Sequence, residues 1–156
     1  MAEAMQHRDP RALLRSAGLR VTSQRVAVLE ELAAHPHSTA DAVAARVRAA
    51  LGSVSKQAVY DVLWALDAAG LVRRIEPAGS PAVFETRAGD NHHHLVCRSC
   101  GVIADIDCAV QAAPCLSPPD HLGFVVDEAE IIFWGLCPTC RITRETNDAT
   151  LERKHG

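Results

Sequence analysis

Apolar residues recur at helical spacing through the first 70 residues of the chain. Positions three and four residues apart form stripes that are typical of amphipathic helices. These stripes predict helices over residues 9–17, 23–34, 40–51 and 56–69. Thr22, Thr39 and Ser55 stand where side-chain N-caps are expected for the last three of these helices. The first half of the chain is therefore predicted to begin as a small bundle of helices.

The helices are followed by a predicted hairpin. Leu71–Ile75 and Ala82–Thr86 have strand character, and residues 76–81 between them contain two prolines and a glycine. Helices followed by a hairpin predict a winged helix-turn-helix over residues 1–86. The polar residues 87–91 are predicted to form a linker.

The second half changes character and is predicted to be a small α/β domain over residues 92–145. Three segments have strand character, namely His94–Cys97, Gly101–Asp107 and Phe124–Trp134. Residues 109–119 are expected to form a short helix or loop. The polar tail after Cys140 is expected to fray, with residues 146–156 disordered. The fold class is therefore α/β in the α+β sense.

Basic and acidic residues are distributed unevenly between the two halves of the chain. Residues 1–74 hold ten Lys and Arg against seven Asp and Glu, whereas residues 75–156 hold six against twelve. The formal net charge of −3 thus conceals a basic half and an acidic half, a split that favours a DNA-facing first half. There is no apolar run of membrane-spanning length and no apolar signal core at the N-terminus. We therefore expect a cytoplasmic protein.

Cysteine pairs provide the most specific chemical signal. Cys97-x-x-Cys100 and Cys137-x-x-Cys140 each follow a strand-like run, and two such turns can present four thiolates to one tetrahedral Zn²⁺. Redox dithiols or buried free cysteines are the alternative. Four thiolates leave no open position, so the predicted zinc is structural. The other two cysteines, Cys108 and Cys115, are expected to be ordinary residues, with a redox role as the alternative.

Histidines and carboxylates form a second candidate site. His92 and His94 share one face of a strand, whereas His93 points away. A set drawn from His37, Glu85, His92, His94 and Asp105 would supply nitrogen and oxygen ligands, which suit Fe²⁺, Mn²⁺ or Zn²⁺. An ion held by this set would join both halves of the chain. Each of these side chains alone would be expected to be a solvated polar residue.

The ordered combination of motifs resembles the ferric uptake regulator family of metal-dependent repressors, from Gly18 to Cys140. The pieces that carry the resemblance are Gly18–Arg25, His37–Asp41, Val54–Tyr60 and His92–Gly101. Within the family the chain looks most like the FurA/CatR-type repressors, which control catalase-peroxidase genes and resemble peroxide sensors.

The resemblance implies a homodimer whose winged helices read double-stranded operator DNA and whose C-terminal halves pair. It also implies structural zinc on the four cysteines. The regulatory ion, Fe²⁺ or Mn²⁺ with Zn²⁺ as an occupant in vitro, would bind His37, Glu85, His92, His94 and Asp105. Peroxide sensors of the family typically have aspartate at the position of Asp105. Glu85, in contrast, resembles the residue that iron sensors have at its position. Asn91 and Ala129 stand where many members have a histidine of a further metal site.

The fourth helix is expected to enter the major groove. Gln57 and Tyr60 could contact bases, and the residues expected to meet phosphates are Arg20, Arg25, Lys56, Arg73 and Arg74. Asp61 stands where some members have arginine, and Tyr60 and Trp64 could instead pack on neighbouring helices. H₂O₂ is expected as a signal rather than as a substrate, and no enzyme activity is expected.

Three alternatives are considered. An iron- or zinc-uptake regulator of the same family differs only in its signal. A zinc hydrolase would need an open metal position and a nearby base, and the chain lacks a His-Glu-x-x-His motif. A metal-buffering protein would need neither the helix-hairpin module nor a basic first half.

Overall fold

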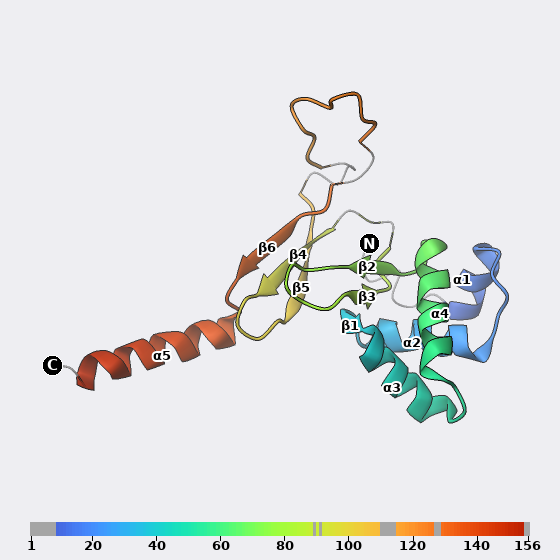
Figure 1. Ribbon diagram of the computed structural model, residues 1–156, viewed down its shortest axis with the longest axis horizontal. Coiled ribbons are helices and arrows are strands. Elements are labelled where there is room, and N and C mark those ends of the chain that lie inside the picture. Colours follow the sequence, from blue (N-terminus) through green and yellow to red (C-terminus); the bar gives the residue numbers. More distant parts are fainter. Residues whose placement is uncertain (1–8, 89, 91, 110–114, 127–128, 155–156) are drawn as a thin grey trace. The chain divides into compact units, whose positions relative to one another are not determined.

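The computed structural model describes residues 9–88, 90, 92–109, 115–126 and 129–154, with side chains up to residue 146. The chain divides into two compact units, Met1–Asp90 and Asn91–Gly156 (Figure 1). The division falls inside the predicted linker, residues 87–91.

The first unit is built on four helices. They are α1 (Pro10–Ser16), α2 (Ser23–Ala34), α3 (Ala40–Leu51) and α4 (Lys56–Ala68). The Thr22, Thr39 and Ser55 side chains accept hydrogen bonds from the backbone N–H three residues further on, at the start of α2, α3 and α4. These are the predicted N-caps, and each satisfies a backbone donor that the first helical turn leaves open.

A three-stranded antiparallel sheet completes the first unit. Its strands are β1 (Ser38–Thr39), β2 (Arg73–Ile75) and β3 (Val83–Glu85), in the order β1-β3-β2. The β2–β3 hairpin is the predicted wing. The two-residue strand β1 was not predicted, and it pairs Ser38 with Phe84 and Thr39 with Val83.

The core of the first unit lies between its helices. Every helix contributes side chains that are almost completely buried, and the helical spacing of these residues is the one expected from the sequence. They include Leu14, Val28, Leu32, Val43, Val47, Val59, Leu63 and Leu66, and Val72 joins the same core from the segment before β2.

The second unit contains a mixed three-stranded sheet and a C-terminal helix. The strands are β4 (His92–Cys97), β5 (Ile103–Asp107) and β6 (Ile132–Gly135), and β4 is central in the order β5-β4-β6. β5 runs antiparallel to β4, whereas β6 runs parallel to it. The sheet and the winged-helix unit together confirm the predicted α+β fold class.

The structure corrects two predictions in the second unit. The strand expected over Phe124–Trp134 is confined to Ile132–Gly135, because Phe124–Val126 form no ladder; residues 127–128 lie outside the described ones. The polar segment after Cys140 is helical, since α5 extends over Pro138–Lys154. Pro138 suits the first helical position, and Arg141 lies within 3.8 Å of Glu145 one turn later. Most of the predicted helix or loop 109–119 lies outside the described residues.

Among the helices that the structure describes, none is both long enough and apolar enough to span a lipid bilayer.

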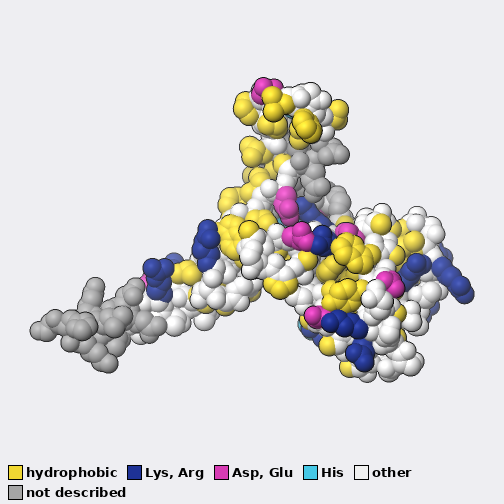
Figure 2. Space-filling model, in the orientation of Figure 1, with side chains coloured by type: hydrophobic (Ala, Val, Ile, Leu, Met, Phe, Trp, Pro, Cys, Tyr) yellow, Lys and Arg dark blue, Asp and Glu magenta, His cyan; other side chains and the backbone are white. Residues whose placement is uncertain are grey.

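The second unit has a sparse apolar core. In its described part the buried hydrophobic side chains are Val96, Cys97 and Cys108, and three buried histidines accompany them. Large apolar side chains are instead exposed, and Figure 2 shows them gathered on the loop between β5 and β6. They include Leu116, Leu122, Phe124 and Val125. A unit of this size with so little apolar burial needs a further source of stability, such as a metal or a partner surface.

Candidate metal centres

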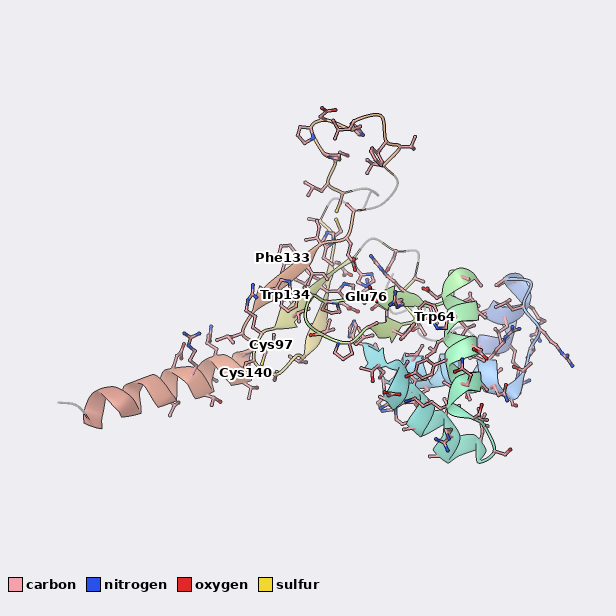
Figure 3. The ribbon with its side chains drawn as sticks, viewed as in Figure 1. Trp64, Glu76, Cys97, Phe133, Trp134 and Cys140 are labelled. Atoms are coloured by element: carbon pink, nitrogen blue, oxygen red, sulfur yellow. The ribbon has the colours of Figure 1, made fainter. Side chains whose placement is uncertain are left out.

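The four predicted cysteines form one group in the second unit, called the four-cysteine cluster below. Cys97 ends β4, Cys100 follows in a tight turn, and Cys137 and Cys140 flank the start of α5 (Figure 3). One thiol sulfur from each residue lies within 4.8 Å of all the others. The Cys100 and Cys137 Sγ atoms are 3.8 Å apart. Two sulfurs bound to one tetrahedral Zn²⁺ at about 2.3 Å are separated by about 3.8 Å, so the cluster fits structural zinc.

The backbone shapes this cluster. The Gly101 N–H donates to the Cys97 carbonyl at 2.9 Å, and Gly101 adopts a left-handed conformation with φ of 75°. Glycine reaches that conformation without the Cβ clash of other residues. The turn therefore brings Cys100 back beside Cys97. The Cys137 N–H donates to Cys97 Sγ at 3.3 Å, which links the two cysteine pairs.

The local environment gives the Cys97 and Cys140 thiols very different pKa values. Hydrogen bonds from the backbone N–H groups of Cys137 and Cys100 favour the thiolate and lower the pKa of Cys97 to about 6. Cys140 accepts a hydrogen bond from Ser99 that lowers its pKa, but the Cys137 and Cys100 thiols oppose this and raise the pKa of Cys140 to about 12. In the metal-free protein at neutral pH, Cys97 is therefore ionised and Cys140 is protonated.

This difference predicts how zinc affinity depends on pH. A thiol binds zinc only as the thiolate, so the proton on Cys140 must leave when zinc binds above neutral pH. The affinity is expected to rise at least about tenfold per pH unit between about pH 7 and 9. Below about pH 6 the dependence should steepen, because Cys97 is then protonated as well. Competition with a chromophoric chelator at several pH values measures this, and an affinity that stays constant between pH 7 and 9 would contradict it.

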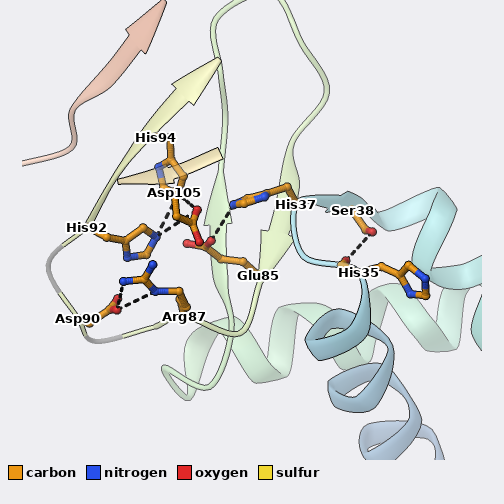
Figure 4. A network of polar contacts seen from close by, with 9 residues as sticks. All are labelled: His35, His37, Ser38, Glu85, Arg87, Asp90, His92, His94 and Asp105. Atoms are coloured by element: carbon orange, nitrogen blue, oxygen red, sulfur yellow. Dashed lines mark hydrogen bonds and ion pairs between the residues drawn. The ribbon is translucent and has the colours of Figure 1, made fainter. Parts of the chain in front are cut away.

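A second cluster in the same unit contains His92, His94 and Asp105. The two histidines alternate along β4 and are 3% and 0% exposed. Their Nε2 atoms lie 3.1 Å apart. Asp105 pairs with His94 across the β4–β5 ladder, and its Oδ1 lies 3.7 Å from His94 Nε2 and 3.9 Å from His92 Nε2 (Figure 4). Two imidazole nitrogens bound to one ion at about 2.1 Å would be about 3.4 Å apart, so these side chains fit a shared divalent cation.

The first unit contains a matching pair, His37 and Glu85. β1 pairs Ser38 with Phe84, and this register sets His37 opposite Glu85 at the end of β3. His37 Nε2 and Glu85 Oε2 are 3.1 Å apart, and the Glu85 side chain is 1% exposed (Figure 4). His37 has a φ of 56°, which costs a non-glycine residue roughly 1–2 kcal/mol. A strained backbone that aims an imidazole at a buried carboxylate is typical of a functional site.

A polar network holds the segment that carries His37. Arg46 on α3 contacts Glu31 on α2, and its Nη2 donates to Ser38 Oγ at 2.6 Å. The Ser38 hydroxyl in turn donates to the His35 carbonyl at 2.7 Å (Figure 4). The two helices thus fix both sides of the turn, and with it the direction of the His37 ring.

Within each unit, the predicted nitrogen and oxygen ligands that belong to that unit therefore lie close together. The prediction that His92 and His94 share a face while His93 points away is observed, since His93 Nε2 lies 3.5 Å from Cys115 Sγ instead. The sequence interpretation missed that contact. The usable signal was a third histidine on the opposite face of β4, together with two unassigned cysteines.

The surface of α4 carries several residues that were predicted to bind DNA. Tyr60 donates its hydroxyl to Asp41 Oδ1 at 2.7 Å, and the Lys56 ammonium pairs with the same carboxylate. The Lys56 hydrogen bond lowers the pKa of Asp41, while the contact with Asp41 raises the pKa of Lys56 and of Tyr60. This network holds Lys56 on the exposed side of the helix, whereas Tyr60 is half-buried and packs against the core of the helices.

Trp64 and Arg74 extend this surface. Trp64 is 49% exposed, and the Arg74 guanidinium lies 4.9 Å from its ring centre (Figure 3). Trp64 is thus half-exposed and lies outside the buried core of the helices. Arg74 also contacts Glu76, and Gln57 donates to Asp61 at 2.8 Å. At the start of α2, Arg25 donates to the Arg20 carbonyl at 2.8 Å.

Comparison with known proteins identifies relatives along most of the chain. The model of the ferric uptake regulator family matches residues 16–114. The transcriptional regulator FurA of Mycobacterium tuberculosis is 65% identical over 130 residues, which cover 83% of this chain and 88% of the relative. Ferric uptake regulation protein 1 of Mycolicibacterium fortuitum is 57% identical over 141 residues, covering 90% and 88% of the two chains.

Solved structures agree with these relatives. The ferric uptake regulator of Pseudomonas aeruginosa with manganese has a TM-score of 0.62 and 29% identity, covering 83% of this chain and 98% of that one. The Campylobacter jejuni peroxide stress regulator has a TM-score of 0.61 and 26% identity, covering 81% and 93%. The family consists of transcription regulators, not enzymes. This chain therefore belongs to the ferric uptake regulator family and is a metal-dependent transcription regulator.

Proposed function

We propose that this regulator is a peroxide-responsive repressor that binds operator DNA as a homodimer when a regulatory Fe²⁺ or Mn²⁺ is bound. The observation that carries the proposal is the set formed by the buried His92 and His94 and the partly exposed Asp105, whose ligand atoms lie 3.1–3.9 Å apart. Imidazole and carboxylate ligands together suit these ions better than thiolates do. Relatives support the choice of ion, since the Pseudomonas aeruginosa structure contains manganese.

His37 and Glu85 would complete the ligand set from the first unit. Their separation of 3.1 Å suits a shared ion, and Glu85 supplies a buried negative charge to offset the ion's own. An ion bound by this pair and by the three ligands of the second unit would restrict how the DNA-reading unit moves against the second unit. It would then act as a corepressor, because it binds the DNA-competent arrangement more tightly than the others.

The proposed DNA interface is the exposed face of α4 and the wing. Gln57 and Tyr60 would face bases in the major groove, and Lys56, Arg73 and Arg74 would meet phosphates together with Arg20 and Arg25. The contact between Lys56 and Asp41 supports this role, since it holds a cation on the exposed side of α4. A dimer would present two such faces to successive major grooves, about 34–36 Å apart.

The proposed homodimer would form through the second unit. Phe133 and Leu95 are 47% and 44% exposed on the sheet, and Leu122, Phe124 and Val125 are exposed on the preceding loop. Covering these side chains in a partner would compensate for the sparse apolar core of the unit. The family relationship supports a dimer of two copies of this chain.

Peroxide sensing would use the same ligands. Fe²⁺ held by these residues would supply electrons to H₂O₂ beside the imidazoles, and one peroxide oxygen would leave as water. His37 or His92 would then gain one oxygen atom and lose its ability to bind the ion, so that the DNA is released. Asp105 supports this choice of signal, because the resemblance assigns aspartate at its position to peroxide sensors. The relatives at 29% identity include the peroxide-responsive repressor PerR of Staphylococcus aureus.

Peptide mass spectrometry after loading with Fe²⁺ and brief exposure to H₂O₂ tests the peroxide step. The expected result is one added oxygen on His37 or His92, in proportion to the DNA released in a parallel binding assay. Protein loaded with Mn²⁺ should show neither change, because Mn²⁺ is not oxidised by peroxide so readily. DNA release without oxygen on either histidine would overturn the proposal and leave an iron- or zinc-uptake regulator as the second candidate.

A further inference from the structure

A third group of metal-binding side chains lies on the opposite face of the β4 sheet. His93 faces away from His92 and His94, and it pairs with Ile106 across the β4–β5 ladder. Cys108 stands two residues beyond Ile106, so it lies on the same face as His93. Cys115 follows on the segment after β5. None of these three residues belongs to the four-cysteine cluster or to the nitrogen and oxygen ligands.

The geometry of the three side chains matches one small ion. Their ligand atoms all lie within 4.8 Å of one another, and His93 Nε2 is 3.5 Å from Cys115 Sγ. A nitrogen and a sulfur bound tetrahedrally to one Zn²⁺, at about 2.1 Å and 2.3 Å, would be about 3.6 Å apart. The three atoms therefore need only small movements to share an ion.

Burial argues that these residues are more than solvated side chains. His93 and Cys108 are 8% and 5% exposed, and Cys115 is half-buried. The Phe133 ring meets the His93 ring edge-on at 6.2 Å, which limits how the imidazole can turn. Within the described residues His93 Nδ1 has no hydrogen-bond partner, and His93 Nε2 makes the contact with Cys115 Sγ.

We propose that His93, Cys108 and Cys115 form a second thiolate-containing site that binds Zn²⁺, with water in the fourth position. Two thiolates and one imidazole are soft to intermediate ligands that favour Zn²⁺ over Mn²⁺. Binding releases the two thiol protons to solvent and involves no oxidation or reduction. The site tethers Cys115 to the central strand β4, and the exposed apolar residues Leu116, Leu122, Phe124 and Val125 follow Cys115 along the chain.

Protection of the two thiols from alkylation tests this proposal on the full-length protein with the zinc of its four-cysteine cluster retained. The His94→Ala variant is used as background, so that zinc cannot occupy the nitrogen and oxygen ligands. Peptide mass spectrometry follows iodoacetamide labelling of Cys108 and Cys115 as Zn²⁺ or Mn²⁺ is added. Zn²⁺ is expected to protect both thiols with one common midpoint, and Mn²⁺ is expected to protect neither.

Substitution of the histidine ligand supplies the second measurement. His93→Gln should raise the zinc midpoint about 10–100-fold, whereas the matched control His121→Ala should leave it unchanged. Co²⁺ in place of Zn²⁺ should give thiolate charge-transfer absorption that falls when Cys115→Ser is introduced. Because Cys115 is only half-buried, Cys115→Ser provides a second test of the site if His93→Gln fails to fold.

Four different results would contradict the proposed zinc site. Protection of only one thiol, equal protection by Mn²⁺, or a midpoint unaffected by both His93→Gln and Cys115→Ser would overturn the proposal. A disulfide between Cys108 and Cys115 that forms in the presence of Zn²⁺ would overturn it too, because a bound ion should block that oxidation. None of these results bears on peroxide sensing, so the two proposals can fail independently.

Discussion

Replacing His94 with alanine is expected to abolish the metal response of DNA binding. His94 is fully buried and lies within 3.1 Å of His92 and 3.7 Å of Asp105, so its loss removes a central ligand. The DNA affinity measured with saturating Mn²⁺ should fall about 10–100-fold, to the level of the metal-free protein. A fluorescence anisotropy titration with operator-containing DNA, at fixed salt and with and without Mn²⁺, measures the effect.

Two controls accompany this experiment: substitution of an exposed histidine elsewhere in the chain, and measurement of the zinc bound to the His94→Ala protein. His121→Ala removes an exposed imidazole and should keep the full Mn²⁺ response. The His94→Ala protein should also retain the zinc of the four-cysteine cluster, since His94 lies outside that cluster. If the variant still shows the full Mn²⁺ response, or if it loses this structural zinc, the assignment of two separate centres is wrong.

Replacing Cys100 with serine is expected to unfold the second unit while the first unit stays folded. Cys100 is an exposed member of the four-cysteine cluster, so the change removes a ligand without opening a cavity in a core. Structural zinc contributes apparent free energies of about 10–16 kcal/mol in small domains. In the described part of the second unit few apolar residues are buried, so little else compensates. The structural zinc should be absent from the purified variant.

Hydrogen exchange read by mass spectrometry resolves the two units. Peptides from β4 to β6 should lose protection in Cys100→Ser, whereas α2 to α4 should keep it because their core is separate. Thr139→Ser is the matched control, since it changes an exposed side chain between Cys137 and Cys140 without removing a sulfur and should keep that zinc. Unchanged protection in β4–β6 after loss of the zinc would show that the metal does not hold this unit together.

The helical half was the most predictable part of the fold. Local chemistry determines its boundaries, as with the Thr39 cap of α3 and the Ser55 cap of α4, and the apolar stripes match the buried positions. β1 was missed because two residues, Ser38 and Thr39, show no alternation that a pattern could reveal. Its pairing with β3 depends on a tertiary contact, and that contact is what brings His37 to Glu85.

The metal ligands were predictable where spacing along the chain reflects geometry. Two Cys-x-x-Cys turns and a His-x-His strand place their side chains together by local rules. His93, Cys108 and Cys115 have no such spacing, and their proximity comes from the register of β4 with β5. The helix after Cys140 was missed because its described side chains are exposed and, apart from Ile142, polar, so no apolar stripe marked it.

A double-mutant cycle between His37 and His94 tests the central claim most directly. The claim is that one regulatory ion is held by ligands from both units and thereby controls DNA binding. Mn²⁺-dependent DNA affinity is measured for His37→Ala, His94→Ala and the double variant. Each single change should remove the Mn²⁺ response, and the double variant should lose nothing further. Additive partial losses, or a full response in either single variant, would contradict the claim.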